Sequence, residues 1–266
     1  YGIYIPYYFV DAFERMNHAE FPKLGLIAVA PNESVEAIQW YRDLVDKHKV
    51  MPNTIWIESL GMQSLQFLES GKVAMMMEAV PNLSLYNFLT IPWDVVPIPR
   101  KPGKSPLYFR AGSGGFSVSF SAKYPEAAWT FLKWWVSKSQ LNFPNPLLKN
   151  VDYVSEWEKQ LPYLKQTHFG EVWKLSEKYS GGDWRNFVRY SSWTYQIFEE
   201  NLNPKYEQML NGRIPIDEYL KAIPETNRKV VEELSRVLEN PNIRSEFKVK
   251  IRSELESVKA LVEKHG

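Results

Sequence analysis

The chain has 266 residues, of which 44% are hydrophobic and 24% charged, so it can bury a substantial core and is neither disordered nor fibrous. Its 32 lysines and arginines balance 31 acidic residues, and the net charge of +1 gives no electrostatic basis for binding nucleic acid or an anionic membrane surface. Cysteine is absent, which excludes thiolate nucleophiles, cysteine metal ligands and disulfides.

Helical and strand-like segments alternate from the beginning of the chain. Residues 1–14 are apolar and aromatic, as in a strand or the start of a buried helix. Apolar side chains recur at three- and four-residue steps in residues 32–48 and again in 59–70, which predicts two amphipathic helices. Gly71 is placed to end the second as a left-handed cap. Residues 73–78 form a continuous apolar run, which predicts a strand buried on both faces.

The alternation continues through the middle of the chain. A helical segment is expected from Pro81 or Asn82 to residue 88, and strands at residues 94–98 and 116–120. Prolines in residues 100–106 predict an exposed connection. Pro125 begins a further predicted helix that runs to residue 136. This order predicts an α/β sheet with crossover connections.

The last third is expected to be almost entirely helical. Periodic apolar positions predict helices at residues 193–210, 216–221, 225–238 and 243–264. The last of these carries a narrow apolar stripe on a strongly charged surface. We expect it to dock against the rest of the molecule, and a coiled-coil contact is the alternative.

Four segments in a fixed order carry a family resemblance. They are residues 67–77 (FLESGKVAMMM), 94–99 (DVVPIP), 112–118 (GSGGFSV) and 124–132 (YPEAAWTFL). The set resembles the extracytoplasmic solute-binding proteins of ABC importers, specifically the carbohydrate-binding family that includes maltose-binding protein. In one respect the sequence departs from the family, which commonly places Gly and an aromatic residue after the strand where Glu78 and Ala79 stand here.

The resemblance implies an α/β, periplasmic-binding-protein-like fold of two lobes joined by hinge segments. Residues 1–98 would form the first part of the second lobe, 99–145 would cross into part of the first lobe, and 146–266 would return to the second lobe as its helix-rich portion. Most of the first lobe is missing from this arrangement. The chain is therefore expected to be the C-terminal portion of a longer protein.

The implied function is that of the substrate-binding component of an ABC importer. Such a protein binds a sugar or oligosaccharide between its lobes, closes by hinge motion and delivers the solute to the membrane permease. The resemblance also implies a monomer without cofactor, metal site or catalytic residues. It would act in the periplasm or anchored by lipid at the cell surface.

Candidate ligand-binding residues are polar or aromatic side chains at strand ends and in loops, because sugar hydroxyls need planar hydrogen-bonding groups and sugar rings need an aromatic face. A loop at residues 181–186 combines glycine, polar and aromatic residues, a composition that suits recognition. The candidates are Glu78, Asn82, Arg110, Ser113, Trp184, Arg185 and Tyr190. The alternatives are helix capping for Glu78 and Asn82, surface exposure for Arg110 and Ser113, and helix packing for Trp184.

Two other functions are weighed against solute binding. The abundance of Trp, Asp and Glu is also typical of a glycoside hydrolase with paired carboxylates, for which Glu78 would be a candidate acid. A helical interaction module built on residues 216–264 is the third possibility. The histidines at 18, 48, 168 and 265 lack the spacing of a zinc motif.

Overall fold

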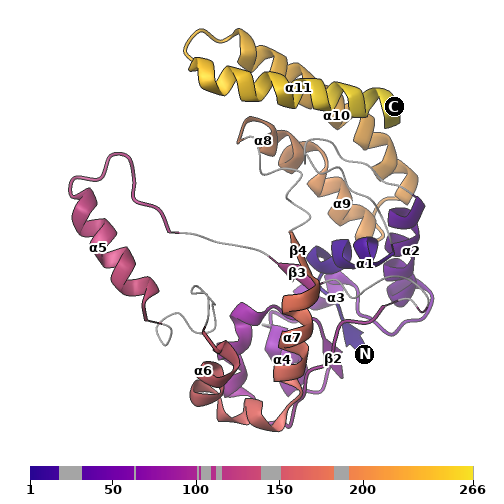
Figure 1. The fold of residues 1–266 in the computed structure, drawn as a ribbon. Coiled ribbons are helices and arrows are strands. Elements are labelled where there is room, and N and C mark those ends of the chain that lie inside the picture. Colours follow the sequence, from indigo (N-terminus) through magenta and orange to yellow (C-terminus); the bar gives the residue numbers. More distant parts are fainter. Residues whose placement is uncertain are drawn as a thin grey trace.

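The computed structural model describes residues 1–17, 32–62, 64–100, 102, 109–111, 116–138, 151–182 and 192–265. Helices make up most of these residues (Figure 1). Within them there are two small sheets of two parallel strands each. One joins β1 (Ile3–Tyr4) to β2 (Met75–Met76), and the other joins β3 (Phe109–Ala111) to β4 (Ser180–Gly182).

The β1–β2 pair is only partly buried. Ile3 lies opposite Met75 and Tyr4 opposite Met76, and the backbone bond from Met77 N to Tyr4 O, 2.9 Å, extends the pairing. Met77 is buried whereas the side chain of Met75 is 55% exposed. The prediction of a strand buried on both faces is therefore wrong, because Met75, which lies on the same face of the strand as Met77, is mostly exposed to solvent.

Short helical elements surround this pair in the first half of the chain. They are η1 (Tyr7–Phe9), α1 (Val10–Met16), α2 (Asn32–Asp46), α3 (Thr54–Ser59), α4 (Ser64–Glu69) and η2 (Val80–Phe88). The helix expected at residues 32–48 is confirmed as α2. Of the helix expected at 59–70, the structure has α4 at Ser64–Glu69, and α3 ends at Ser59, where the predicted helix begins. Gly71 has φ of +67° and donates to Leu68 O at 2.9 Å, which confirms the predicted left-handed cap.

Two predicted strands have no counterpart. Residues 94–98 are extended but pair with no strand among the described residues, and residues 116–119 likewise form no ladder. In the first segment Pro97 lacks an N–H, and Pro99, two positions later, also lacks one, so the backbone offers few donors for a ladder. Apolar runs alone did not distinguish these segments from true strands.

The second half is mostly helical, and the prediction of an almost entirely helical last third is confirmed for the described residues. Its elements are α5 (Pro125–Val136), α6 (Tyr153–Gln160), η4 (Pro162–Gln166), α7 (Phe169–Tyr179), α8 (Ser192–Asn201), α9 (Asn203–Leu210), α10 (Ile216–Glu239) and α11 (Ser245–His265). The helices expected at 216–221 and 225–238 form the single helix α10, which continues through Pro224. Helix α11 packs against α10 with Ile251, Leu255 and Val258 buried, which confirms the expected docking.

Buried side chains form two separate clusters. The larger joins β1 and α1 to α2, α8, α9, α10 and α11, and Val10, Val230 and Leu234 at its centre have no exposed surface. The smaller lies between η2, α6, η4 and α7 around Trp157, which is 1% exposed. The β1–β2 pair lies where these two groups of helices meet (Figure 1).

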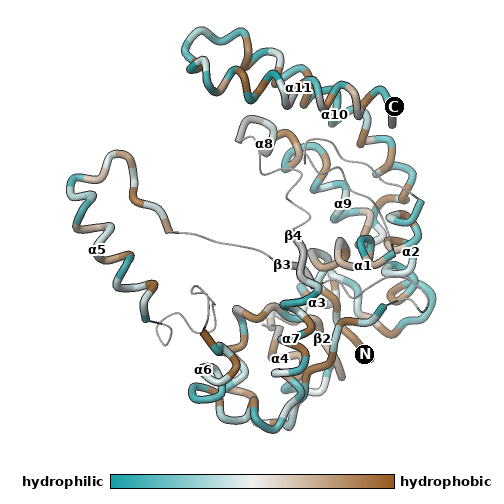
Figure 2. Tube along the Cα trace, viewed as in Figure 1, coloured by the Kyte–Doolittle hydropathy of each residue, from teal (hydrophilic) through white to brown (hydrophobic). Residues whose placement is uncertain are grey.

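Helix α5 differs from every other long helix because it stands apart from them (Figure 1). None of its 12 residues, all of them described, is buried. Trp129, Phe131 and Trp134 are 53%, 55% and 48% exposed, and Figure 2 shows hydrophobic residues recurring along the helix. An exposed aromatic surface of this kind normally packs against another part of a protein.

Candidate functional site

The candidate site lies at the edge where β1 and β2 both end. Because the strands are parallel, their carboxyl ends meet at the same edge, and this is the edge at which open α/β sheets bind ligands. Tyr4 is the last residue of β1, and Glu78 follows β2 by two positions. The pairing thus brings together two polar side chains that are far apart in the sequence.

Glu78 and Asn82, both predicted from the sequence, are in direct contact. Asn82 Nδ2 donates to Glu78 Oε1 at 2.6 Å, and the N–H of Ala79 donates to the same oxygen at 2.8 Å. Both side chains are half-buried. Ala79 directly precedes η2, but no side-chain hydrogen bond caps the start of that helix, so the capping interpretation is not supported.

Two tyrosines near Glu78 stay protonated at neutral pH. Burial, and then the negative charge of Glu78, raises the pKa of Tyr4 above its ordinary value. The same two causes, in the same order, raise the pKa of Tyr86 strongly. Each phenol can therefore donate a hydrogen bond beside a carboxylate and an amide.

An aromatic cluster adjoins Tyr86. The ring of Tyr86 lies 4.8 Å from that of Trp93, which lies 5.2 Å from that of Tyr163. The hydroxyl of Tyr163 accepts from the backbone N–H of Trp93 at 3.2 Å. These residues and Tyr4 were not predicted. The sequence could have identified Tyr4 as an aromatic residue at the end of a strand. It could not have identified Tyr163, which meets Trp93 only through the packing of η4.

The remaining candidates are placed in part. Arg110 lies in β3 opposite Gly181 of β4, so the segment around Arg110 runs beside the beginning of the loop at residues 181–186. Ser113, Trp184, Arg185 and Tyr190 lie outside the described residues. The pairing thus places Arg110 beside Ser180–Gly182 and says nothing further of these four candidates.

The described residues carry neither a metal-binding cluster nor a membrane-spanning helix. In the described part of the chain, no group of three or more His, Asp and Glu side chains is positioned to hold a metal ion. Among the helices described, none combines the length and the apolar character needed to cross a bilayer.

A carboxylate, an amide and two protonated phenols at a parallel strand edge form a hydrogen-bonding site for a small polar molecule, which is the chemistry of a small-molecule-binding protein. The sequence matches the family described as bacterial extracellular solute-binding protein over residues 6–141, slightly more than half of the chain. The chain belongs to this family. No curated protein matches the sequence.

Membership defines the function at the level of the family. The chain is the substrate-binding component of an ABC importer, with an extracytoplasmic location, a small-molecule ligand and an ABC permease as its partner. Members of the family are generally not enzymes, and the family suggests a two-lobe periplasmic-binding fold.

Proposed function

We propose that the protein binds a sugar or oligosaccharide at the edge where β1 and β2 end, and that it delivers the sugar to the permease by hinge closure. The observation that carries the proposal is the grouping of Tyr4, Glu78, Asn82 and Tyr86 at that edge. The protein acts as a monomer, in the periplasm or anchored by lipid at the cell surface.

The polar groups suit sugar hydroxyls because each hydroxyl both donates and accepts. Glu78 supplies an acceptor, the phenols of Tyr4 and Tyr86 supply donors, and the amide of Asn82 supplies both. The bond between Asn82 and Glu78 keeps these two groups paired when no ligand is bound, which lowers the cost of the empty state.

The aromatic cluster suits the apolar face of a sugar ring. The family's usual aromatic residue after the second strand is absent here, where Glu78 and Ala79 stand. Tyr86 and Trp93 follow shortly afterwards, and their half-buried rings meet edge to face. We assign the stacking role to these rings, with Trp184 as a further candidate together with Arg110, Ser113, Arg185 and Tyr190.

The domain assignment is part of the proposal. Residues 1–98 and 146–266 form the second lobe, and 99–145 belong to the first. The exposed aromatic side chains of α5 support this division, because they need a partner surface that the described residues do not supply. The rest of the first lobe would supply it, and on this proposal it lies N-terminal to the present sequence in a longer protein.

Isothermal titration of the full-length protein against a panel of mono- and oligosaccharides tests the proposal. We expect one class of sugar to bind, and we expect Glu78→Gln and Asn82→Ala to weaken its binding about tenfold or more. Glu58→Gln, at an exposed position of α3, is the matched control and should bind normally. Absence of binding to every sugar would refute the carbohydrate assignment.

An assay for reducing ends on the same protein distinguishes a receptor from a glycoside hydrolase. A receptor returns its bound oligosaccharide unchanged, whereas a hydrolase releases reducing ends. Reducing-end release that is lost in Glu78→Gln would replace the present proposal with the enzymatic one.

A further inference from the structure

The turn between α10 and α11 and the start of α11 lie at an outer edge of the molecule (Figure 1). The turn is ordered, because the side chain of Asn240 accepts from the N–H of Asn242 at 2.9 Å. Helix α11 packs against α10 through the side that carries Ile251, Leu255 and Val258. The other sides of its first two turns are mostly open to solvent.

Basic residues gather on this exposed start. Residues 244–252 contain four basic residues and one acidic residue, although the whole chain is almost neutral. The basic residues are Arg244, Lys248, Lys250 and Arg252. Glu246 lies 3.9 Å from the guanidinium of Arg244, and both of these side chains are mostly exposed. Within the described part of the chain, no ion pair neutralises the other three basic side chains.

This arrangement of charge works against the helix that carries it. The N-terminal end of a helix has a partial positive charge, so cations there are unfavourable. Arg244, Lys248 and Arg252 also follow one another at steps of four residues, where like charges on a helix repel. The N–H of Lys248 donates to Arg244 O at 3.1 Å, so the helical spacing holds from Arg244 onward. Local conflicts of this kind are expected where a protein binds a partner.

Two exposed apolar side chains lie among the basic ones. Phe247 is 45% exposed and Val249 is 65% exposed. Lys250 is three positions from Phe247 and Arg252 is three positions from Val249, so each apolar side chain has a basic neighbour on its own side of the helix. Apolar side chains next to lysines and arginines are typical of a helix that lies at a membrane interface.

We propose that the start of α11, residues 244–252, docks on an anionic lipid surface. Its basic side chains lie among the phosphates of the headgroups, whose charge they complement, and Phe247 and Val249 reach the boundary of the acyl chains. These two apolar residues are two positions apart, so they leave the helix on different sides. A rigid protein surface would meet one of these sides, whereas a fluid layer of headgroups surrounds both.

Such docking places the protein beside its partner. The family acts outside the cytoplasm and has a membrane permease as its partner. A chain held at the lipid surface searches for the permease along that surface instead of through the whole surrounding volume. This role depends on the location and the partner of the family, and not on which solute binds.

Flotation of the chain with lipid vesicles tests the proposal. One set of vesicles contains phosphatidylcholine alone, and the other contains phosphatidylcholine and phosphatidylglycerol in equal parts. We expect the anionic vesicles to bind the chain about tenfold or more tightly than the neutral ones, and we expect added salt to weaken this binding. Equal binding to the two sets would overturn the proposal. No binding to either set would also overturn it, and would favour an acidic protein surface as the partner.

Two double variants locate the charged part of the contact. Lys248→Gln combined with Lys250→Gln should weaken binding to the anionic vesicles about tenfold or more, since each lysine near an anionic surface contributes about fivefold. Lys165→Gln combined with Lys221→Gln removes the same charge from exposed positions of η4 and α10, and should weaken binding much less. Equal effects of the two double variants would overturn the proposal.

Phe247→Ser tests the apolar part of the contact. It should weaken vesicle binding about fivefold, because the ring no longer reaches the acyl chains. Phe131→Ser is the matched control, since Phe131 on α5 is 55% exposed. An equal effect of Phe131→Ser would place the contact on α5 and overturn the proposal. Circular dichroism confirms that each variant is folded. The assays contain no sugar, so every outcome leaves the sugar assignment standing.

Discussion

Asp94 and His168 form a two-point contact. Asp94 Oδ2 lies 2.5 Å from His168 Nδ1, and the backbone N–H of His168 donates to Asp94 Oδ1 at 2.8 Å. The contact joins the extended segment at residues 94–98 to the start of α7. Asp94 thus binds His168 through its side chain, although the sequence predicted that residues 94–98 form a strand.

This contact should depend on pH. The hydrogen bond from the backbone of His168 is the main cause that lowers the pKa of Asp94, and the hydrogen bond to Asp94 is the main cause that raises the pKa of His168. The aspartate contribution is lost as pH falls through its lowered pKa, and the histidine contribution is lost as pH rises through its raised pKa. The contact is therefore strongest between roughly pH 4 and pH 6.5.

NMR titration of the His168 ring checks this expectation. The pKa of His168 should fall towards its ordinary value in Asp94→Asn, and it should not change in Asp152→Asn, which removes a carboxylate that caps α6. A histidine pKa that is the same with and without the Asp94 carboxylate would show that the contact does not form in solution.

Trp157→Ala should destabilise the fold strongly. The ring is buried and lies 4.7 Å from the ring of Trp173 and 5.7 Å from that of Phe169. Its removal should cost about 3–5 kcal/mol in the free energy of unfolding, measured with urea. Trp134→Ala on α5 is the control, with a much smaller loss expected. Similar losses in both variants would mean that the smaller cluster is not a packed core.

Gly71→Ala should destabilise the protein through the backbone alone. Gly71 has φ of +67°, and a Cβ atom there would meet nothing within 4 Å. The expected cost is about 1–2 kcal/mol from the left-handed conformation. Gly170→Ala, in helix α7, provides the contrast, because its backbone is helical and alanine favours helices. Equal urea midpoints for the two variants would contradict the cap geometry.

Glu14 should tolerate replacement by glutamine better than by alanine. The carboxylate is 5% exposed and accepts from the hydroxyl of Tyr206 at 3.3 Å, and its charge, after burial itself, raises the pKa of Tyr219. Glu14→Ala leaves buried donors behind and should cost about 1–3 kcal/mol. Glu14→Gln keeps an acceptor at the same place. Urea unfolding of the two variants gives the comparison, and a costlier glutamine variant would contradict it.

The isolated chain should bind a hydrophobic dye through α5. Trp134→Ser should reduce the fluorescence of 8-anilinonaphthalene-1-sulfonate, because it removes an exposed ring from an unpacked aromatic surface. Trp40→Ser, at a similarly exposed ring elsewhere, should reduce it less. If both variants keep the full dye signal, the side chains of α5 are covered in solution.

Local signals explain what the sequence predicted correctly. Helices α2 and α5 follow from apolar periodicity, and the end of α4 follows from Gly71, because these features depend on neighbouring residues only. The contact between Glu78 and Asn82 also arises locally, since one side chain follows the other by four positions. The family resemblance depended on order and spacing, and the family match over residues 6–141 confirms it in its broader form.

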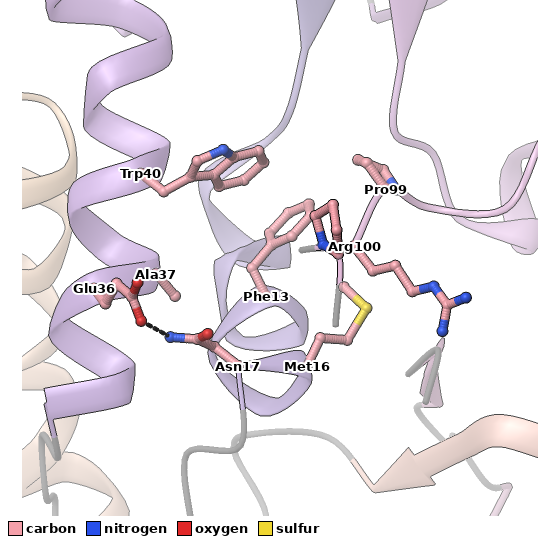
Figure 3. Close-up of a pocket in the computed structure, with 9 residues that line it drawn as sticks. Phe13, Met16, Asn17, Glu36, Ala37, Trp40, Pro99 and Arg100 are labelled. Carbon is pink, nitrogen blue, oxygen red and sulfur yellow. Dashed lines mark hydrogen bonds between the residues drawn. The ribbon is translucent and has the colours of Figure 1, made fainter. Parts of the chain in front are cut away.

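Long-range packing explains what the sequence missed. Trp93 and Tyr163 meet only because η4 folds against the chain after η2, and no spacing in the sequence encodes that contact. The pocket between α1, α2 and the segment at Pro99 is similar, since Phe13, Trp40 and Pro99 come from three separate parts of the chain (Figure 3). Residues 94–98 have a strand-like composition, yet they pair with no strand in the part of the chain that the structure describes. Pro97 lacks a donor there, and Asp94 bonds to His168.

The β1–β2 pair has a consequence for the order of folding. It joins the two ends of a loop on the order of 70 residues. The chain must therefore lose the conformational entropy of closing that loop before any hydrogen bond between the two strands forms. Helices such as α2 can form early from local contacts, whereas Tyr4 and Glu78 meet only at a late step. A nascent chain that has not yet emerged past β2 therefore has helices but no edge at which a solute could bind.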